Sequence, residues 1–224
     1  MRFSFLKMSL LALLTLFCLA TTASAAIISF ESGDGVGESN NLTGTNVLIT
    51  PHPAWDTLPN GVWPATLPDG KWVGHDQTGY NGIVFPNTTI VGGPSVVFYE
   101  SFMLPYGNNS GNAIFGADDT MGVYITNSLY TNLLLMVPNP VQDGACADGQ
   151  IACEPGEFRV INLSPYLTQG VNTLKMDVYQ IDGGPMGGIW AGQISSVPEP
   201  GTYALMGVGF LVLGLFRHNI KNKR

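Results

Sequence analysis

The sequence predicts an all-β protein, an antiparallel β-sandwich of the jelly-roll type, and two observations lead to this fold class. First, apolar and polar side chains alternate with period two in residues 97–104 and 174–179, as in half-buried strands. Second, about ten such short segments follow one another, separated by turns rich in Gly, Pro and Asn. The sandwich is expected between an N-terminal signal peptide and a short C-terminal apolar helix.

Residues 1–25 have the pattern of a secretory signal peptide. Arg2 and Lys7 precede an apolar stretch at 8–20, and Ala23 and Ala25 supply small side chains at the positions that a signal peptidase reads. Cleavage is expected after Ala25. The chain would then be exported as one β-sandwich domain, residues 26–196, with a tail at 197–224.

The domain contains a regular series of strand candidates and one interruption. The expected strands cover residues 27–30, 47–50, 81–85, 97–104, 113–115, 121–126, 133–137, 158–162, 174–179 and 188–194. Residues 51–79 break this rhythm with five prolines and three tryptophans, which predicts a long ordered loop on the sandwich.

Trp55, Trp63 and Trp72 in this loop are the candidate ligand-binding residues, since an exposed indole ring can stack on the face of a sugar. The alternative is burial, because a sandwich usually encloses such large side chains. The location of these rings therefore separates a sugar-binding loop from a purely structural one.

The charge of the domain excludes one class of partner. Residues 26–196 carry three basic and 15 acidic side chains, a formal charge of −12, which the whole-chain value of −7 conceals. Nucleic acid and anionic membrane surfaces require a cationic patch that this composition does not supply. Cations and neutral or basic ligands are the expected partners.

Asp118 and Asp119 lie in a Gly/Asp turn, at 115–120, that precedes an alternating strand. Acidic residues at such a turn often serve only to bond nearby backbone amides. Their hard oxygen atoms also suit Ca²⁺, so they are the candidate metal ligands. His52 and His75 are too few and too isolated to predict a zinc site.

Together with the later stretch Leu163–Ser164–Pro165–Tyr166–Leu167 and the Gly170-x-Asn172 turn, this turn resembles the galactose-binding-like jelly roll across residues 95–195. The resemblance implies a non-catalytic sandwich of the carbohydrate-binding kind, in some cases with a structural Ca²⁺ as its only cofactor. It assigns a sugar-binding role to no particular residue, because the binding loops of such folds vary.

Cys146 and Cys153 are the two cysteines that remain after signal cleavage, and they lie seven residues apart in a Gly- and Asp-containing loop. In an exported, oxidising setting they are expected to form a disulfide. It would act as a local clip.

The C-terminal tail has three parts in a fixed order. Pro198–Glu199–Pro200 enforces an extended, accessible backbone. An apolar run of 14 residues follows at 203–216, and as a helix it would span about 21 Å, against about 30 Å for the hydrocarbon core of a membrane. A basic cluster then ends the chain, at Arg217, Lys221, Lys223 and Arg224.

This tail resembles the PEP-CTERM sorting signal, which is cleaved by exosortase, although its basic residues are spread behind His218 and Asn219. The resemblance implies an exosortase-type protease as a partner, transient association of the apolar helix with the inner membrane, and delivery to the envelope, outer surface or extracellular matrix of a Gram-negative-type bacterium. The basic end favours the cytoplasmic side. An ordinary C-terminal membrane anchor is the alternative.

These observations predict an exported, non-enzymatic protein of the envelope or matrix, either a structural module or a carbohydrate-binding one whose partner is extracellular polysaccharide. The alternative is a secreted glycoside or polysaccharide hydrolase, which would need two separated carboxylates in a cleft, one with a strongly perturbed pKa. No catalytic residues are predicted, since Asp118 and Asp119 are adjacent on a strand entry and make a poor catalytic pair.

Overall fold

The computed structural model of the protein describes residues 24–139, 141, 146, 151–181, 183–199, 209 and 212. The predicted signal peptide up to residue 23, Pro200, and the basic residues Arg217, Lys221, Lys223 and Arg224 lie outside these residues, as does the expected apolar helix except at Gly209 and Val212. Among the described residues, no helix has the length and hydropathy needed to cross a membrane. Residues Ala26–Ser196 form one compact unit.

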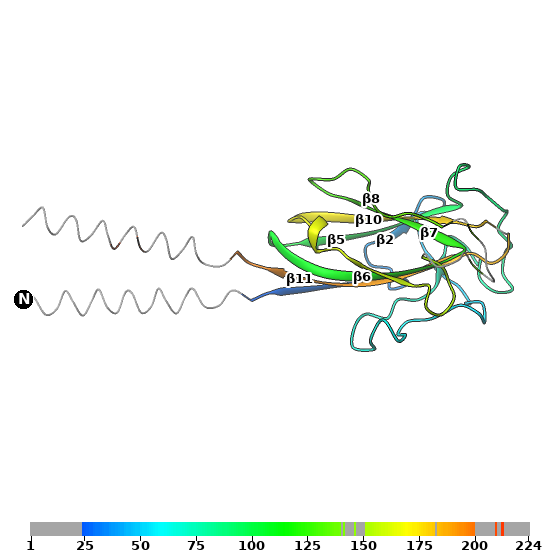
Figure 1. Ribbon diagram of the computed structural model, residues 1–224, viewed down its shortest axis with the longest axis horizontal. Helices are drawn as coiled ribbons and strands as arrows, with labels where there is room; N and C mark the ends of the chain where they lie inside the picture. The colour runs from blue at the N-terminus through cyan, green and yellow to red at the C-terminus, as the bar shows by residue number, and fades with distance from the viewer. Residues whose placement is uncertain are drawn as a thin grey trace, which may run out of the picture. The chain divides into compact units, whose positions relative to one another are not determined.

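The described strands form two antiparallel sheets that face each other, as the all-β sandwich prediction requires (Figure 1). Sheet A has six strands in the order β3-β4-β11-β6-β9, with β1 also paired to β11, and sheet B has five strands in the order β2-β5-β10-β7-β8. The strands are β1 (Ala26–Glu31), β2 (Glu38–Asn40), β3 (Val47–Leu48), β4 (Val73–Gly74), β5 (Val96–Leu104), β6 (Asn108–Asp118), β7 (Thr120–Thr126), β8 (Leu133–Met136), β9 (Arg159–Asn162), β10 (Gly170–Tyr179) and β11 (Gly187–Val197).

The alternation in the sequence determines which face of each strand is buried. In β10, Leu174, Met176 and Val178 are fully buried between the sheets, while Thr173 and Lys175 lie on the outer face. The neighbouring β5 is in register with β10, so that Met176 pairs with Phe98. Because side chains along a strand have period two, one register places all of the apolar set in the core.

The main core lies between the two sheets and is rich in aromatic rings. Trp190 of β11 packs against Phe98 of β5, with ring centroids 5.6 Å apart, and Phe30 of β1 stacks on Phe102 at 4.8 Å. The Phe30 ring occupies the space where a side chain at position 192 would project, since a Cβ there would come within 2.1 Å of it. Gly192 is therefore required for β1 to pack on β11.

A second core lies on the outer face of sheet A, beneath the Pro- and Trp-rich loop. Its members come from that loop, from sheet A and from the disulfide segment: Ile49, Trp55, Leu58, Trp63, Trp72, Ile114, Cys146, Ala152, Cys153, Phe158, Ile189 and Ala191. The loop is thus ordered by burial of its own aromatic rings, as a loop of this length requires.

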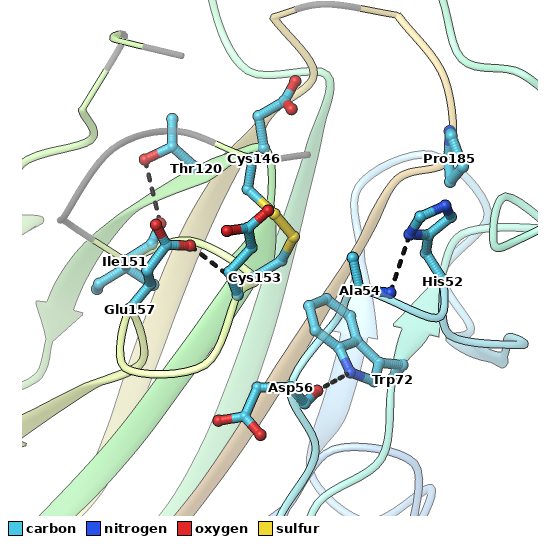
Figure 2. The surroundings of a disulfide bond; sticks show 12 residues. His52, Ala54, Asp56, Trp72, Thr120, Cys146, Ile151, Cys153, Glu157 and Pro185 are labelled. Atoms are coloured by element: carbon cyan, nitrogen blue, oxygen red, sulfur yellow. Dashed lines mark hydrogen bonds between the residues drawn. A yellow bond between two sulfur atoms is a disulfide. The ribbon is translucent and has the colours of Figure 1, made fainter. Parts of the chain in front are cut away.

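The predicted disulfide between Cys146 and Cys153 is present, with Cα atoms 5.8 Å apart, and both residues are fully buried (Figure 2). The adjoining backbone is bonded on two sides. The carbonyl of Cys153 accepts a hydrogen bond from Asp56 N at 2.6 Å, and the carbonyl of Ile151 accepts from Met121 N at 3.2 Å. The disulfide segment therefore joins the Trp-rich loop to the β6–β7 connection, rather than forming only a local clip.

One expected strand is absent and two short strands were not expected. Residues 81–85 form a turn in which Asn81 has φ of 60°, and only Phe85 makes an isolated bridge, to Gly184. The short strands β2 and β4 were missed because three and two residues are too few to display an alternation.

Candidate functional site

A hollow of about 420 Å³ lies on the outer face of sheet A, at the margin of the Trp-rich loop. We call it the amide hollow, because it is lined by side-chain amides and hydroxyls against an apolar wall. Its lining residues are Ile27, Trp63, Leu67, Ser110, Gly111, Asn112, Asn162, Ser164, Gln193 and Ser195.

Three strands of sheet A position the amides. Asn112 of β6 and Asn162 of β9 are direct cross-strand partners, and both are exposed. Gln193 and Ser195 project from β11, which pairs with β6 on the side away from β9. Residues opposite each other in an antiparallel pair have Cβ atoms about 5 Å apart, so the amides form a contiguous polar floor.

The backbone at Gly111 keeps this floor open. A Cβ at this position would lie 2.3 Å from the carbonyl oxygen of Gln193, so only glycine allows β6 to approach β11 there. The same residue holds Ser164, whose Oγ accepts a hydrogen bond from Gly111 N at 3.0 Å. The hydroxyl of Ser164 is thereby fixed at the edge of the hollow.

The amides retain hydrogen-bonding capacity. Asn162 Oδ1 accepts from Ser164 N at 3.0 Å, which leaves its NH₂ group without a partner among the described residues. Gln193 Nε2 donates to Ser29 Oγ across a long 3.4 Å. Each amide group carries two donor hydrogens and an acceptor oxygen, so the floor can both donate to and accept from a bound molecule.

The wall of the hollow is apolar and rigid. Trp63 is 3% exposed, and its Nε1 donates to the carbonyl of Pro68 at 2.6 Å, which locks the indole in place. Leu67 packs against the same second core. The lining contains no acidic or basic side chain. An apolar wall beside uncharged donors and acceptors matches a neutral, hydroxyl-rich molecule.

The three loop tryptophans are buried, which is the alternative that the sequence left open for them. Trp55, Trp63 and Trp72 are 5%, 3% and 3% exposed, and Trp55 and Trp72 pack with ring centroids 4.2 Å apart. Apolar side chains on the outer face of sheet A draw the loop down and enclose the rings. Only Trp63 borders the amide hollow, while Trp72 borders a smaller hollow of about 330 Å³ with Leu58 and Lys71.

The candidate calcium ligands Asp118 and Asp119 lie at the junction of β6 and β7, joined by a cis peptide bond, and both are buried. Asp119 Oδ2 accepts a hydrogen bond from Ile181 N at 2.5 Å, in keeping with a turn-forming role. Asp118 lies near the sulfur atoms of Cys146 and Cys153, which are bonded to each other and are therefore not thiolate ligands. Calcium binding by the two carboxylates stays a prediction.

Glu100 of β5 is the acid with the most perturbed environment. It is 1% exposed, and its Oε2 accepts a hydrogen bond from Trp190 Nε1 at 2.9 Å. Its pKa is raised from 4.5 to about 8, chiefly by burial and also by the nearby Asp34 and Glu38, against the opposing effect of the Trp190 hydrogen bond. Glu38 is its cross-strand partner, yet neither carboxylate lines either of the two hollows described above.

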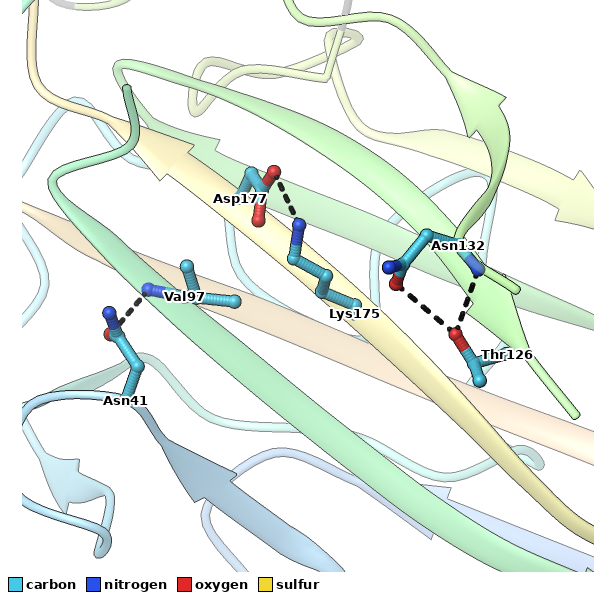
Figure 3. A network of polar contacts seen from close by, with 6 residues as sticks. All are labelled: Asn41, Val97, Thr126, Asn132, Lys175 and Asp177. Carbon is cyan, nitrogen blue, oxygen red and sulfur yellow. Dashed lines mark hydrogen bonds and ion pairs between the residues drawn. The ribbon is translucent and has the colours of Figure 1, made fainter. Parts of the chain in front are cut away.

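The outer face of sheet B carries a different polar network (Figure 3). Lys175 Nζ lies 2.9 Å from Asp177 Oδ2 and 4.5 Å from the ring centroid of Tyr124. Asp177 is buried beneath this contact, and both members of the ion pair belong to β10, so the contact of Lys175 with Tyr124 is the one that reaches across to β7.

Reasoning from the sequence missed the amide hollow. Asn112, Asn162 and Gln193 occupy alternate, outward positions of strands, where polar residues ordinarily face solvent. The available signal was the frequency of amides, since Asn is depleted in strands relative to Thr and the β-branched residues.

Comparison with known families matches residues 196–218 to the PEP-CTERM protein-sorting motif. The chain therefore carries a PEP-CTERM sorting motif, which indicates an exported, envelope-associated protein of Gram-negative bacteria that is processed by exosortase. No curated protein matches the chain.

Three solved structures are similar to this chain at low levels. A family 35 carbohydrate-binding module from Clostridium thermocellum is 12% identical, with 76% of this chain and 98% of that one covered and a TM-score of 0.34. A cycloisomaltooligosaccharide glucanotransferase from Paenibacillus sp. is 13% identical. The similarity covers 75% of this chain and 18% of that one, with a TM-score of 0.30. The isomalto-dextranase of Arthrobacter globiformis T6 is 11% identical. The similarity covers 78% of this chain and 33% of that one, with a TM-score of 0.28.

Proposed function

We propose that this exported protein is a non-enzymatic, carbohydrate-binding component of the cell envelope or extracellular matrix, and that the amide hollow is its binding site. The composition of the hollow carries the proposal. Side chains of Asn112, Asn162 and Gln193 present donors and acceptors beside the fixed indole of Trp63. Sugars offer the complementary surface, with hydroxyl groups at the edges of the ring and C–H groups on its faces.

The position of the hollow supports the same role. It lies on strands of the sandwich rather than on a loop tip, so its amides are held by the sheet before any ligand arrives. A preformed site saves the entropy of ordering side chains on binding. The sorting motif would bring this site into contact with polysaccharide outside the cell.

The test is affinity electrophoresis and calorimetry of the full-length protein, solubilised in a polyoxyethylene detergent so that no glycosidic detergent competes. The panel contains neutral polysaccharides and the exopolysaccharide of the producing cells. Replacing Asn112 and Gln193 together by Ala should weaken binding about tenfold or more, since each lost hydrogen bond contributes about 0.5–1.5 kcal/mol.

Asn108→Ala is the matched control. Asn108 is exposed on the same strand and points to the same side as Asn112, but it does not line the hollow; it lies about 13 Å from Asn112 and about 7 Å from Ser110, the nearest lining residue of β6. This variant should bind like the wild type. Equal binding by wild type and by the Asn112/Gln193 double variant would remove the hollow from consideration.

The alternative function, a secreted hydrolase, is favoured by one observation, the pairing of Glu38 with the perturbed Glu100. The burial of Glu100 and the absence of both residues from the two hollows favour binding without turnover. Incubation with each bound polysaccharide, followed by size-exclusion chromatography, separates the two functions. A decrease in polymer length that is lost in Glu100→Gln would establish the hydrolase.

A further inference from the structure

Charge distinguishes the amide hollow from the rest of the domain. The lining offers only amides, hydroxyls and apolar groups. The surrounding domain carries a formal charge of −12, with Lys71, Arg159 and Lys175 as its only basic residues. Two of these three are engaged elsewhere: Lys175 pairs with Asp177, and Arg159 donates to the carbonyl of Phe158.

A carboxylate or sulfate in the hollow would therefore meet no compensating cation and would feel the negative field of the domain. Carboxylate-bearing ligands are normally bound by Arg or Lys, which supply charge-assisted hydrogen bonds. Amide and hydroxyl groups instead form neutral hydrogen bonds, whose strength depends little on salt.

We propose, on the basis of the carbohydrate-binding function above, that the amide hollow selects uncharged glycans and rejects glycans that carry carboxylate or sulfate groups. The selection has two parts. The neutral lining binds hydroxyl groups, and the acidic domain repels anionic chains before they reach the lining.

The experiment uses three polymer backbones, β-1,4-glucan, galactomannan and dextran, each in a neutral and a carboxymethylated form. Binding by the full-length protein is measured at 20 mM and 500 mM NaCl. At least one neutral form should bind with an affinity that changes less than twofold between the two salt concentrations. Its carboxymethylated form should bind at least tenfold more weakly at 20 mM NaCl, and the difference should narrow at 500 mM as the repulsion is screened.

A designed cation should reduce the preference. Ser110 lines the hollow and is exposed, so Ser110→Lys adds a positive charge there without disturbing the core. It should improve binding of the carboxymethylated form about fivefold at 20 mM NaCl, an effect that 500 mM NaCl abolishes. Asn108→Lys makes the same change in net charge outside the lining, about 7 Å from Ser110, and should have a smaller effect on the preference than Ser110→Lys.

The outcomes separate this inference from the function on which it rests. Binding of a carboxymethylated form as tightly as its neutral counterpart, at low salt, would overturn the selectivity and leave carbohydrate binding intact. Equal effects of Ser110→Lys and Asn108→Lys would show that the net charge, and not the hollow, sets the preference, which also overturns the inference. Failure of all six polymers and of the native exopolysaccharide to bind would overturn both proposals.

Discussion

Glu100 shows how strongly one residue can depend on its surroundings in this fold. Its position in β5 has the inward phase that Phe98 and Phe102 also have, so the strand carries a carboxyl group into the core. A charged carboxylate is costly there, and its pKa rises from 4.5 to about 8 because the protonated form is favoured by burial. Trp190, in the opposite sheet, donates a hydrogen bond to the Glu100 carboxyl group.

This raised pKa predicts that stability falls with increasing pH. The contribution of Glu100 is fully present below pH 4.5, where both the folded and unfolded states are protonated, and it is lost as the pH rises toward about 8. The shift of the pKa from 4.5 to about 8 corresponds to on the order of 5 kcal/mol in the free energy of unfolding. Glu100→Gln, which imitates the neutral form, should match the wild type near pH 4.5 and exceed its stability at pH 8.

Urea unfolding of both proteins between pH 4.5 and 8 measures this effect. Subtracting the two curves removes the shared contribution of His75, whose pKa is lowered by burial and which therefore acts in the opposite direction. If the difference between the curves stays constant across this range, Glu100 ionises normally in the folded protein.

At the scale of elements, most strands of the sandwich were predictable from the sequence and the second core was not. The alternation in β5 and β10 identified both strands, since a half-buried strand in a sandwich imposes period two on its residues. The Trp-rich loop has no such periodicity. Whether its rings face solvent depends on Ile114, Ile189 and Phe158, which are distant in sequence and gather only when sheet A forms.

The second core also explains the miss at the candidate site. A sequence can show that Trp63 lies in a Pro-rich loop, but not that this part of the loop lies beside Asn112 and Gln193. The sorting motif was readable for the opposite reason, since a protease reads it as a linear segment and all of its parts are contiguous.

Trp72 packs within the loop and also against Phe158 outside it, with ring centroids 6.1 Å apart, so its removal should be costly. Its ring lies 4.2 Å from that of Trp55, and its Nε1 donates to the carbonyl of Asp56 at 2.8 Å (Figure 2). Trp72→Ala should reduce the free energy of unfolding by about 3–5 kcal/mol. Replacing both cysteines by Ser should cost less, about 2 kcal/mol, because the disulfide closes a short loop.

Urea titration of the two variants under non-reducing conditions gives the ranking. Tyr80→Ala serves as the control, since Tyr80 is 39% exposed and its ring contacts only His52 among the aromatic side chains described. A Trp72→Ala variant as stable as this control would mean that the loop is not fastened to sheet A through the second core.

The whole molecule combines a compact unit with a sorting tail that begins where that unit ends. Ser196 is the last residue of the unit and pairs with Ala26 of β1. The pairing between β1 and β11 therefore extends to the last residue of the unit. Val197 completes β11, and the Pro198–Glu199 segment follows directly. The folded unit and the processing segment are therefore separated by a residue or two.

Two changes at the tail should have different consequences. Deleting residues 200–224 should leave the unfolding free energy unchanged and alter only the location of the protein, because the ladder between β1 and β11 is intact. Deleting from residue 193 onward removes four of the six cross-strand pairs of β1 and should destabilise the domain. Cell fractionation and urea unfolding report the two effects separately.

Replacement of Pro198, Glu199 and Pro200 by Ala should block processing, since it removes the extended backbone that the protease requires. In cells that carry exosortase, mass spectrometry should place the mature C-terminus of the wild type near residues 198–201, while the variant should persist as uncut precursor in the inner membrane. A mature wild-type protein that still contains Phe216 would identify the tail as a permanent anchor.

Gln193 and Ser195 lie on β11 close to the C-terminal end of that strand, and this position has a mechanical consequence. Both residues line the amide hollow, and β11 ends two residues after Ser195. A force between a bound glycan and the C-terminal end of β11 would thus reach that end through a few residues of a strand that is held on both sides, by β1 and by β6. Contacts of the glycan with Asn112 and Asn162 would pass their share of the load through β6 and β9, so tension would be borne by sheet A, while sheet B would carry almost none of it.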